Sequence, residues 1–196
     1  MGRNRLEAFS DGVLAIILTI MVLELRRPPG ASFADLMSLG PVLFSYVLSF
    51  VYVGIYWNNH HHLFHATERV NGAILWANLH LLFWLSLFPF ATAWIGERTL
   101  SPVPTAVYGF ILLMAAIAYY ILQSLIIAAQ GPNSRLKAAL GSDWKGKLSP
   151  VVYLIAMPFA FVNPKVSMGL YLFIALVWLV PDRRIERMYS LHKASN

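Results

Sequence analysis

Cysteine is absent from this 196-residue sequence, and charged side chains are scarce, at 12% of residues. The lack of cysteine excludes disulfide bonds, thiolate catalysis and thiolate metal sites. A soluble domain has about 25% charged and about 45–50% apolar residues, whereas this sequence is 58% hydrophobic, with a mean hydropathy of +0.61. A soluble domain of this length cannot bury so much apolar surface, and disordered chains are poor in it. The sequence therefore predicts an integral membrane protein.

The few charges carry an excess of one sign, with a net charge of +6 and an isoelectric point of about 9.7. In a soluble protein this excess would suggest nucleic-acid binding. In a membrane protein, basic residues collect on the cytoplasmic loops. We therefore expect membrane lipid and no nucleic acid as a partner.

Six apolar stretches approach the length of about 20 residues that a membrane-spanning helix needs. Proline and glycine clusters, which break helices, separate most of them. The sequence predicts an all-α, polytopic membrane protein in which residues 1–196 form a single six-helix unit. The spans are expected at about residues 6–25, 36–59, 73–95, 105–129, 148–162 and 166–180. The last two are short and only residues 163–165 separate them, so we expect a tight helical hairpin that barely spans.

The basic residues divide unequally between the two sides of a six-span topology. Eleven lie on the side of the termini: Arg3, Arg5, Arg69, Arg135, Lys137, Lys145, Lys147, Arg183, Arg184, Arg187 and Lys193. Four lie on the other side: Arg26, Arg27, Arg98 and Lys165. This bias predicts a multi-pass protein of the cell membrane with both termini cytoplasmic.

The first span has two different faces when it is drawn as a helix. Phe9, Gly12, Ile16, Ile20 and Leu23 form one stripe within about 40° of Ile16, at 100° per residue. A carboxylate and a hydroxyl lie well away from this stripe, and a threonine lies at its edge; these are Asp11, Ser10 and Thr19.

Asp11 is an ionisable residue inside a span, where such groups are costly and mark a functional site by default. We expect its partners at the cytoplasmic ends of other spans, where Arg5, Trp57, His60 and Asn78 lie, with His60 as the residue most closely tied to it. The main interpretation is a structural polar network. Partial hydration near the membrane surface and direct substrate binding are the alternatives.

The first span also carries a motif that we recognise. Arg5-x-x-x-Phe9-Ser10-Asp11-Gly12-Val13-x-Ala15-Ile16-x-x-Thr19 resembles the opening signature of the transmembrane protein 175 family, which comprises the endolysosomal potassium channel and its bacterial relatives. Trp57-x-x-His60-His61 and the stretch from Asn78 to Pro89 are also similar to the family's pattern. The last hundred residues match only in their pattern of spans.

This resemblance implies a potassium-permeable channel with no cofactor. It implies a homotetramer with the first helix around a central pore. The family's aliphatic constriction would correspond to Ile16, Ile20 and Leu23, with Thr19 as a neighbouring polar ring, and Phe9, Ser10 and Asp11 would tether helices. Ile20 stands where relatives often have leucine.

Two features of conventional potassium channels are missing from the sequence. It has no Thr-Val-Gly-Tyr-Gly filter, which would strip the ion with backbone carbonyls, and no span with arginine at every third position, which would sense voltage. The remaining way to select and gate ions is a hydrophobic constriction that closes by dewetting. Such a constriction favours potassium because potassium loses water more readily than sodium.

Four histidines, His60, His61, His62 and His65, cluster at the end of the second span. Interfacial side chains, metal ligation and proton sensitivity are the alternatives for them. Two other functions stay open, a metal-dependent membrane enzyme and a secondary transporter, although paired interrupted spans, typical of transporters, are not evident. We expect no metal and no catalysis, and we take most tyrosines and tryptophans as markers of the membrane interface.

Overall fold

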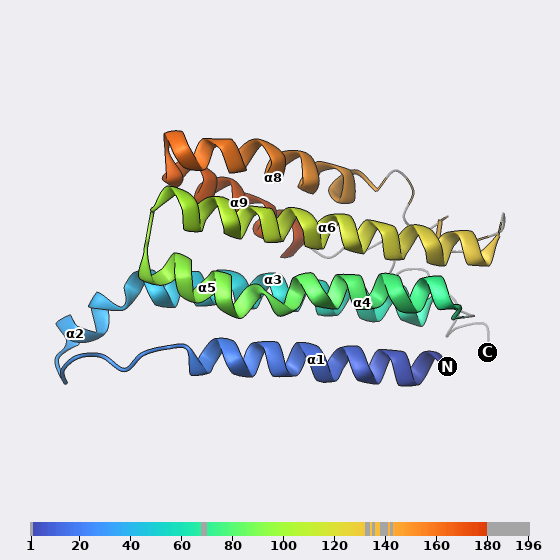
Figure 1. Ribbon diagram of the computed structural model, residues 1–196, viewed down its shortest axis with the longest axis horizontal. Helices are drawn as coiled ribbons and strands as arrows, with labels where there is room; N and C mark the ends of the chain where they lie inside the picture. Colours follow the sequence, from blue (N-terminus) through green and yellow to red (C-terminus); the bar gives the residue numbers. More distant parts are fainter. Residues whose placement is uncertain are drawn as a thin grey trace.

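The computed structural model describes residues 2–67, 70–131, 134, 136–137, 141 and 143–179. Within these residues the regular structure is entirely helical, as expected for an all-α membrane protein (Figure 1). The helices are α1 (Arg3–Leu23), α2 (Phe33–Ser38), α3 (Gly40–His65), α4 (Gly72–Ser86), α5 (Phe88–Glu97), α6 (Pro102–Gln130), α8 (Trp144–Val162) and α9 (Pro164–Leu179).

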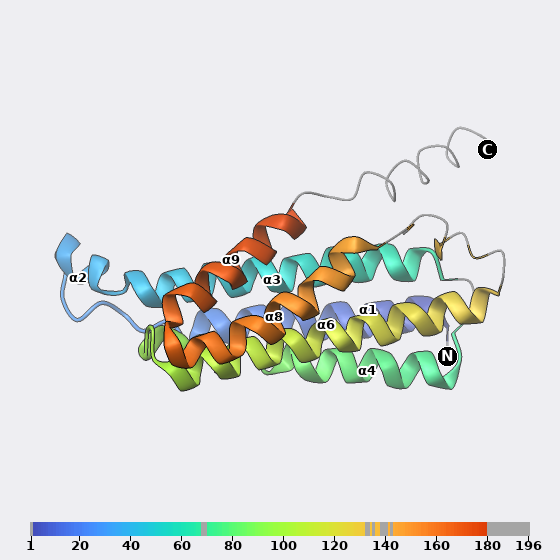
Figure 2. The ribbon, with the colours of Figure 1, turned by 90° about the horizontal axis from the view of Figure 1, so that it is seen from above.

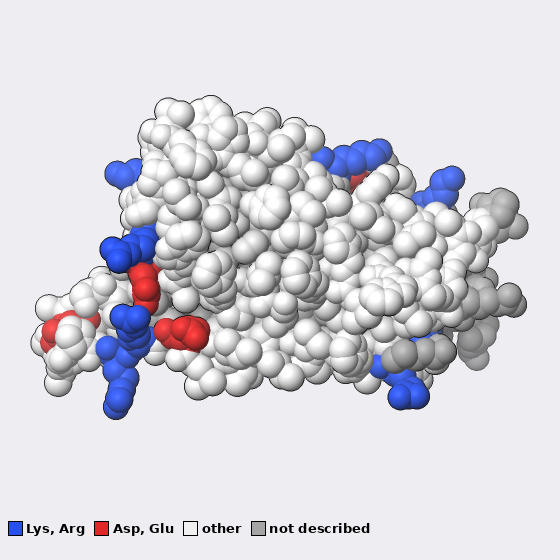
Figure 3. Space-filling view, viewed as in Figure 1, with Lys and Arg blue, Asp and Glu red and all other residues white. Residues whose placement is uncertain are grey.

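Five segments are long and apolar enough to cross a membrane: α1, α3, the stretch Gly72–Glu97 that contains α4 and α5, α6 and α8. The sixth predicted span corresponds to α9, which is apolar but has only 16 residues within the described part of the chain. On the face in Figure 3, charged side chains gather toward the two ends and leave a broad uncharged belt between them. This belt is what a membrane-embedded surface requires.

The third predicted span, residues 73–95, is two helices. α4 ends at Ser86, and α5 begins at Phe88 with Pro89 in its first turn. Proline has no N–H to donate and its ring excludes the preceding turn, so the helix is interrupted there. At the other end of α4, Asn71 caps the helix by accepting a hydrogen bond of 2.9 Å from the Ile74 backbone N–H.

The long helices run side by side, with α1 at one edge of the bundle (Figures 1 and 2). α1 packs against α3, α4 and α5, whereas α6 packs against α4, α5, α8 and α9. α8 and α9 form the expected hairpin, joined at Asn163, and lie on the side of the bundle away from α1. The placement of α1 at the edge leaves one of its faces without a partner in the chain.

Tyrosines fill the interior between α3, α6, α8 and α9. Tyr52, Tyr108, Tyr153 and Tyr171 are all at most 2% exposed. Tyr153 donates to the Tyr52 hydroxyl, which in turn donates to the Tyr171 carbonyl, over 3.2 and 2.6 Å. The interpretation of most tyrosines as interface markers is therefore wrong for these four, whose hydroxyls find partners inside the protein.

Candidate functional site

α1 buries one face and exposes the other. The buried face consists of Leu6, Ser10, Leu14, Ile17 and Met21, at the three- and four-residue spacing of a helix. The opposite face includes Ile16, Ile20 and Leu23, which are 60%, 41% and 76% exposed; we call these three residues the aliphatic stripe. Phe9 lies on the same side and is 49% exposed. The two faces thus differ as the helical drawing of the sequence predicted.

Thr19 adds a polar group beside the aliphatic stripe. Its side chain is exposed, and its hydroxyl donates a hydrogen bond of 2.9 Å to the Ala15 carbonyl of its own helix. The hydroxyl proton is therefore occupied, and the oxygen lone pairs remain to accept from water or to face a cation.

A buried chain of hydrogen bonds fixes the other face of α1. His60 Nε2 bonds to Asn78 Oδ1 over 2.8 Å, Asn78 Nδ2 donates to Ser10 Oγ over 2.9 Å, and Ser10 Oγ donates to the Leu6 carbonyl over 2.9 Å. Because the Asn78 oxygen accepts, His60 Nε2 carries the proton. This chain joins α3, α4 and α1 in the interior.

A second set of contacts joins α1 to α3 nearer the surface. The Trp57 indole donates to Asp11 Oδ1 over 3.1 Å, and His61 Nδ1 lies 2.9 Å from Glu7 Oε1. The Trp57 and His61 rings stack, with centroids 6.3 Å apart. Glu7 and Asp11 are one turn apart on α1, as Trp57 and His61 are on α3, so the four side chains form a two-rung ladder.

The structure places the predicted polar residues in two groups. Ser10, His60 and Asn78 are brought together in the interior, whereas Asp11 contacts Trp57 at the surface. Asp11 bonds to Trp57 rather than to His60, which turns into the bundle and bonds to Asn78, another member of the expected network. Arg5 is exposed, and its guanidinium makes no hydrogen bond with the residues that the structure describes. The sequence interpretation missed Glu7 and His61, although the matching spacing on the two helices was a usable signal.

A groove of about 620 Å³ runs between α1 and α5, beyond the middle of the aliphatic stripe. Ile20 and Glu24 line it from α1, and Phe90, Trp94 and Glu97 line it from α5. At its edge Arg26 forms an ion pair of 2.6 Å with Glu97. The exposed stripe therefore ends at a hollow that carries carboxylates.

The histidine cluster does not assemble a metal centre within the described residues, where no group of three or more histidine, aspartate or glutamate side chains is arranged to hold an ion. His61 and His65 lie on neighbouring turns with ring centroids 6.1 Å apart. His61 is instead engaged with Glu7 and Trp57.

Known proteins resemble this chain over nearly its whole length. A sequence profile described as the endosomal/lysosomal potassium channel TMEM175 matches residues 5–89. A protein of Chryseobacterium sp. (strain P1-3), named a potassium channel, is 55% identical over 187 residues, or 95% of this chain and 97% of the relative. A protein of Streptomyces collinus, also named a potassium channel, is 30% identical over 89% of this chain and 90% of the relative.

The fold agrees with a solved structure. The crystal structure of a lysosomal potassium-selective channel TMEM175 homolog from Chamaesiphon minutus superimposes with a TM-score of 0.80 at 28% identity, covering 92% of this chain and 97% of that one. Because sequence and structural similarity both extend through the spans after residue 89, where the motifs end, the chain belongs to the TMEM175 family.

Proposed function

We propose that this chain is a subunit of a potassium-permeable cation channel of the cell membrane. Relatives that cover most of this chain are named potassium channels, and the fold is that of a potassium-selective homolog. The observation that carries the proposal is the α1 face described above. Three aliphatic side chains and a threonine are exposed on a helix whose opposite face is anchored by a buried hydrogen-bond chain.

The exposed surface of α1 contacts further subunits and a water-filled pore rather than lipid. Asp11 is exposed on α1 within the chain, and a carboxylate that faced hydrocarbon would be strongly destabilised. Surrounding α1 with further copies of the chain removes this cost, because the carboxylate then faces protein or water. A homo-oligomer, with four subunits as the family resemblance implies, places four copies of the aliphatic stripe around one axis.

Permeation through such a pore depends on partial dehydration of the ion. A ring of isoleucine and leucine side chains excludes water when it is narrow and admits hydrated ions when it widens. Potassium holds its water less firmly than sodium and therefore crosses more easily, and the Thr19 oxygens replace part of the lost hydration. No catalytic step, metal or cofactor enters this mechanism. The excess of basic residues on the side of the termini supports a cytoplasmic location for both of them.

Potassium flux into liposomes that contain the purified chain tests the proposal. The wild type is expected to conduct, and Ile16→Asn is expected to change the flux because it makes one ring of the proposed constriction polar. Val22→Asn is the matched control: Val22 is also exposed on α1 but lies about 120° around the helix from Ile16. Equal effects of the two substitutions would contradict the pore-facing stripe, and saturable exchange without conductance would indicate a transporter.

A further inference from the structure

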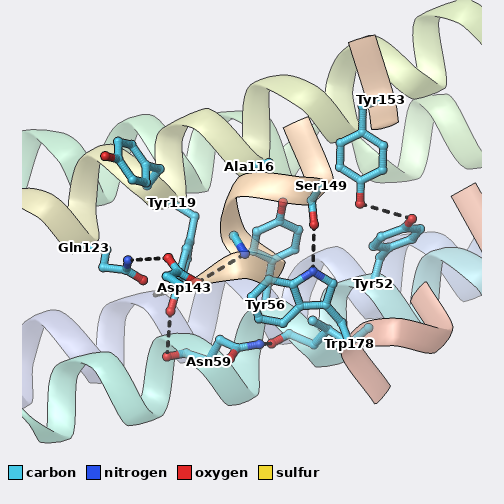
Figure 4. A pocket seen from close by; sticks show the side chains of 13 residues that line it. Tyr52, Tyr56, Asn59, Ala116, Tyr119, Gln123, Asp143, Ser149, Tyr153 and Trp178 are labelled. Atoms are coloured by element: carbon cyan, nitrogen blue, oxygen red, sulfur yellow. Dashed lines mark hydrogen bonds between the residues drawn. The ribbon is translucent and has the colours of Figure 1, made fainter. Parts of the chain in front are cut away.

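A partly open cavity lies on the side of the bundle away from α1, between α3, α6, α8 and α9 (Figure 4). Its volume is about 40 Å³, and a single water molecule needs about 10–15 Å³. The cavity therefore has room for about three non-hydrogen atoms of a ligand. Its walls are mostly aromatic and include Tyr56, Tyr119, Tyr153 and Trp178.

One wall residue presents a polar group that the protein leaves without a partner. Tyr56 is only 9% exposed, and its hydroxyl makes no hydrogen bond with the described residues. Two other wall hydroxyls are engaged: Tyr119 donates to the Asn59 carbonyl over 3.3 Å, and Tyr153 donates to Tyr52. Among the described residues, His60 Nδ1 is the fully buried side-chain nitrogen or oxygen atom that lacks a partner, so the Tyr56 hydroxyl is accessible from the cavity and can bond to a guest there.

A carboxylate gives the cavity a negative charge. Asp143 lines it just before α8, where one oxygen caps the helix at the Gly146 N–H over 3.2 Å and the other accepts from Gln123 Nε2 over 2.9 Å. These two bonds hold the carboxylate in place and leave lone pairs on both oxygens. The aromatic faces around it also attract positive charge.

Trp178, one of the wall residues, already makes a cation–π contact with a lysine that is not itself among the wall residues. The Lys145 ammonium lies 5.9 Å from the centroid of the indole ring, within the range of a cation–π contact. The ring itself is fixed, because Trp178 Nε1 donates to Ser149 Oγ over 2.8 Å. A rigid aromatic wall, a carboxylate and a free hydroxyl acceptor are the groups that recognise an alkylammonium.

We propose that this cavity binds the ammonium head of a small organic amine. The ammonium donates to Asp143 and to the Tyr56 oxygen, and its carbon atoms contact the aromatic rings. Bare potassium suits the site less well, since that ion needs several oxygen ligands and the walls are mainly carbon. The cavity is remote from α1, so the proposal does not depend on which face of α1 lines a pore. A free amine and a phosphatidylethanolamine head group share this chemistry.

Saturation-transfer NMR of the purified full-length protein tests the site with ethylammonium and its neutral counterpart ethanol. Three non-hydrogen atoms limit the dissociation constant to about 0.5 mM at best, which this method detects. We expect ethylammonium to bind at least fivefold more tightly than ethanol. Asp143→Asn should remove the preference, and it should fold because asparagine also caps helices and tolerates the left-handed backbone at this position (φ 39°).

Tyr56→Phe should weaken both probes, whereas Asp35→Asn, an acidic residue outside the bundle, is the control and should change neither. Equal binding of the two probes, or ethylammonium binding that Asp143→Asn leaves unchanged, would overturn the proposal, as would no binding. Binding in lipid nanodiscs distinguishes a free amine from a phosphatidylethanolamine head group as the natural source of the ammonium. If phosphatidylethanolamine discs weaken ethylammonium binding relative to phosphatidylglycerol discs, the head group of the lipid occupies the site; equal binding indicates a free amine, and both results support the ammonium site.

Discussion

The indole N–H of Trp57 on α3 bonds to the Asp11 carboxylate on α1 over 3.1 Å. This single contact gives the intramembrane charge of α1 a partner without a basic residue. It also sets the rotation of α1 about its axis, because Asp11 and the aliphatic stripe lie on different sides of the same helix. The stripe can face a pore only while α1 keeps this rotation, so the anchor and the proposed permeation path are coupled.

Asp11→Ala is therefore expected to harm assembly more than permeation. It removes a hydrogen bond to a charged group, worth about 1–2 kcal/mol, and so weakens the outer contact between α1 and α3 while the buried chain through Ser10 remains. Size-exclusion chromatography with light scattering should show a smaller oligomeric fraction, and thermal unfolding should occur at a lower temperature. Trp57→Phe removes the same bond from the other side and should behave alike. Intact oligomers that have lost all flux would contradict this role and indicate that Asp11 contacts the ion.

Glu24 lies one helical turn after Ile20, just beyond the aliphatic stripe, and lines the groove toward α5. It is exposed and ends α1, where the helix dipole disfavours a negative charge. Arg26, two residues on, pairs with Glu97 instead. A carboxylate kept at this position would concentrate cations at the mouth of the proposed pore.

Glu24→Gln should therefore lower potassium conductance by about two- to fivefold at low salt. The difference should vanish near 1 M salt, where the screening length is only about 3 Å. Single-channel recording at several ionic strengths measures both values, with Asp35→Asn as a control of the same charge change on α2. A reduction that is independent of salt would contradict an electrostatic role.

Gly109 on α6 faces the Tyr171 hydroxyl of α9 so closely that a methyl group there would overlap it. Tyr171 cannot easily move, because it is fully buried and donates to the Thr105 carbonyl over 3.2 Å. Gly109→Ala should thus destabilise the protein by about 1–3 kcal/mol. Gly169→Ala is the matched control, since nothing lies within 4 Å of its added methyl group. Thermal unfolding measures both variants. Equal unfolding midpoints would contradict the claim that Tyr171 leaves no space for a side chain at Gly109.

The short helix α2 should respond to acid. Ser32 and Asp35 form a reciprocal cap, and hydrogen bonds from the Ser32 side chain and backbone lower the pKa of Asp35 below its ordinary value of 3.8. Because the folded pKa is the lower one, the cap contributes stability above pH 3.8 that is lost as the pH falls through the folded value. The protection of the α2 amides against hydrogen exchange, relative to an unfolded chain at the same pH, should decrease in that range. Ser32→Ala should abolish this pH dependence. Unchanged protection at low pH would contradict the cap.

The predicted segments coincide with helices, whereas their contacts were predicted poorly. The positions of proline and glycine predicted the ends of most helices to within a few residues, because these residues interrupt a helix at or next to their own position. The break before Pro89 was missed because the apolar run continues through it. Within the expected polar network His60 was tied most closely to Asp11, whereas Asp11 bonds to Trp57 and His60 to Asn78, since partner choice depends on how α3 is rotated against α1 and α4. The tyrosine-lined cavity had no local signature at all, because its walls come from four helices.

The most direct test of the account is the reversal potential of the reconstituted protein under opposed potassium and sodium gradients. A potassium-permeable channel predicts a reversal potential shifted toward the potassium equilibrium value, with a reduced shift in Ile16→Asn and no change in Val22→Asn. Absence of current from correctly folded oligomers under every gradient would contradict the account.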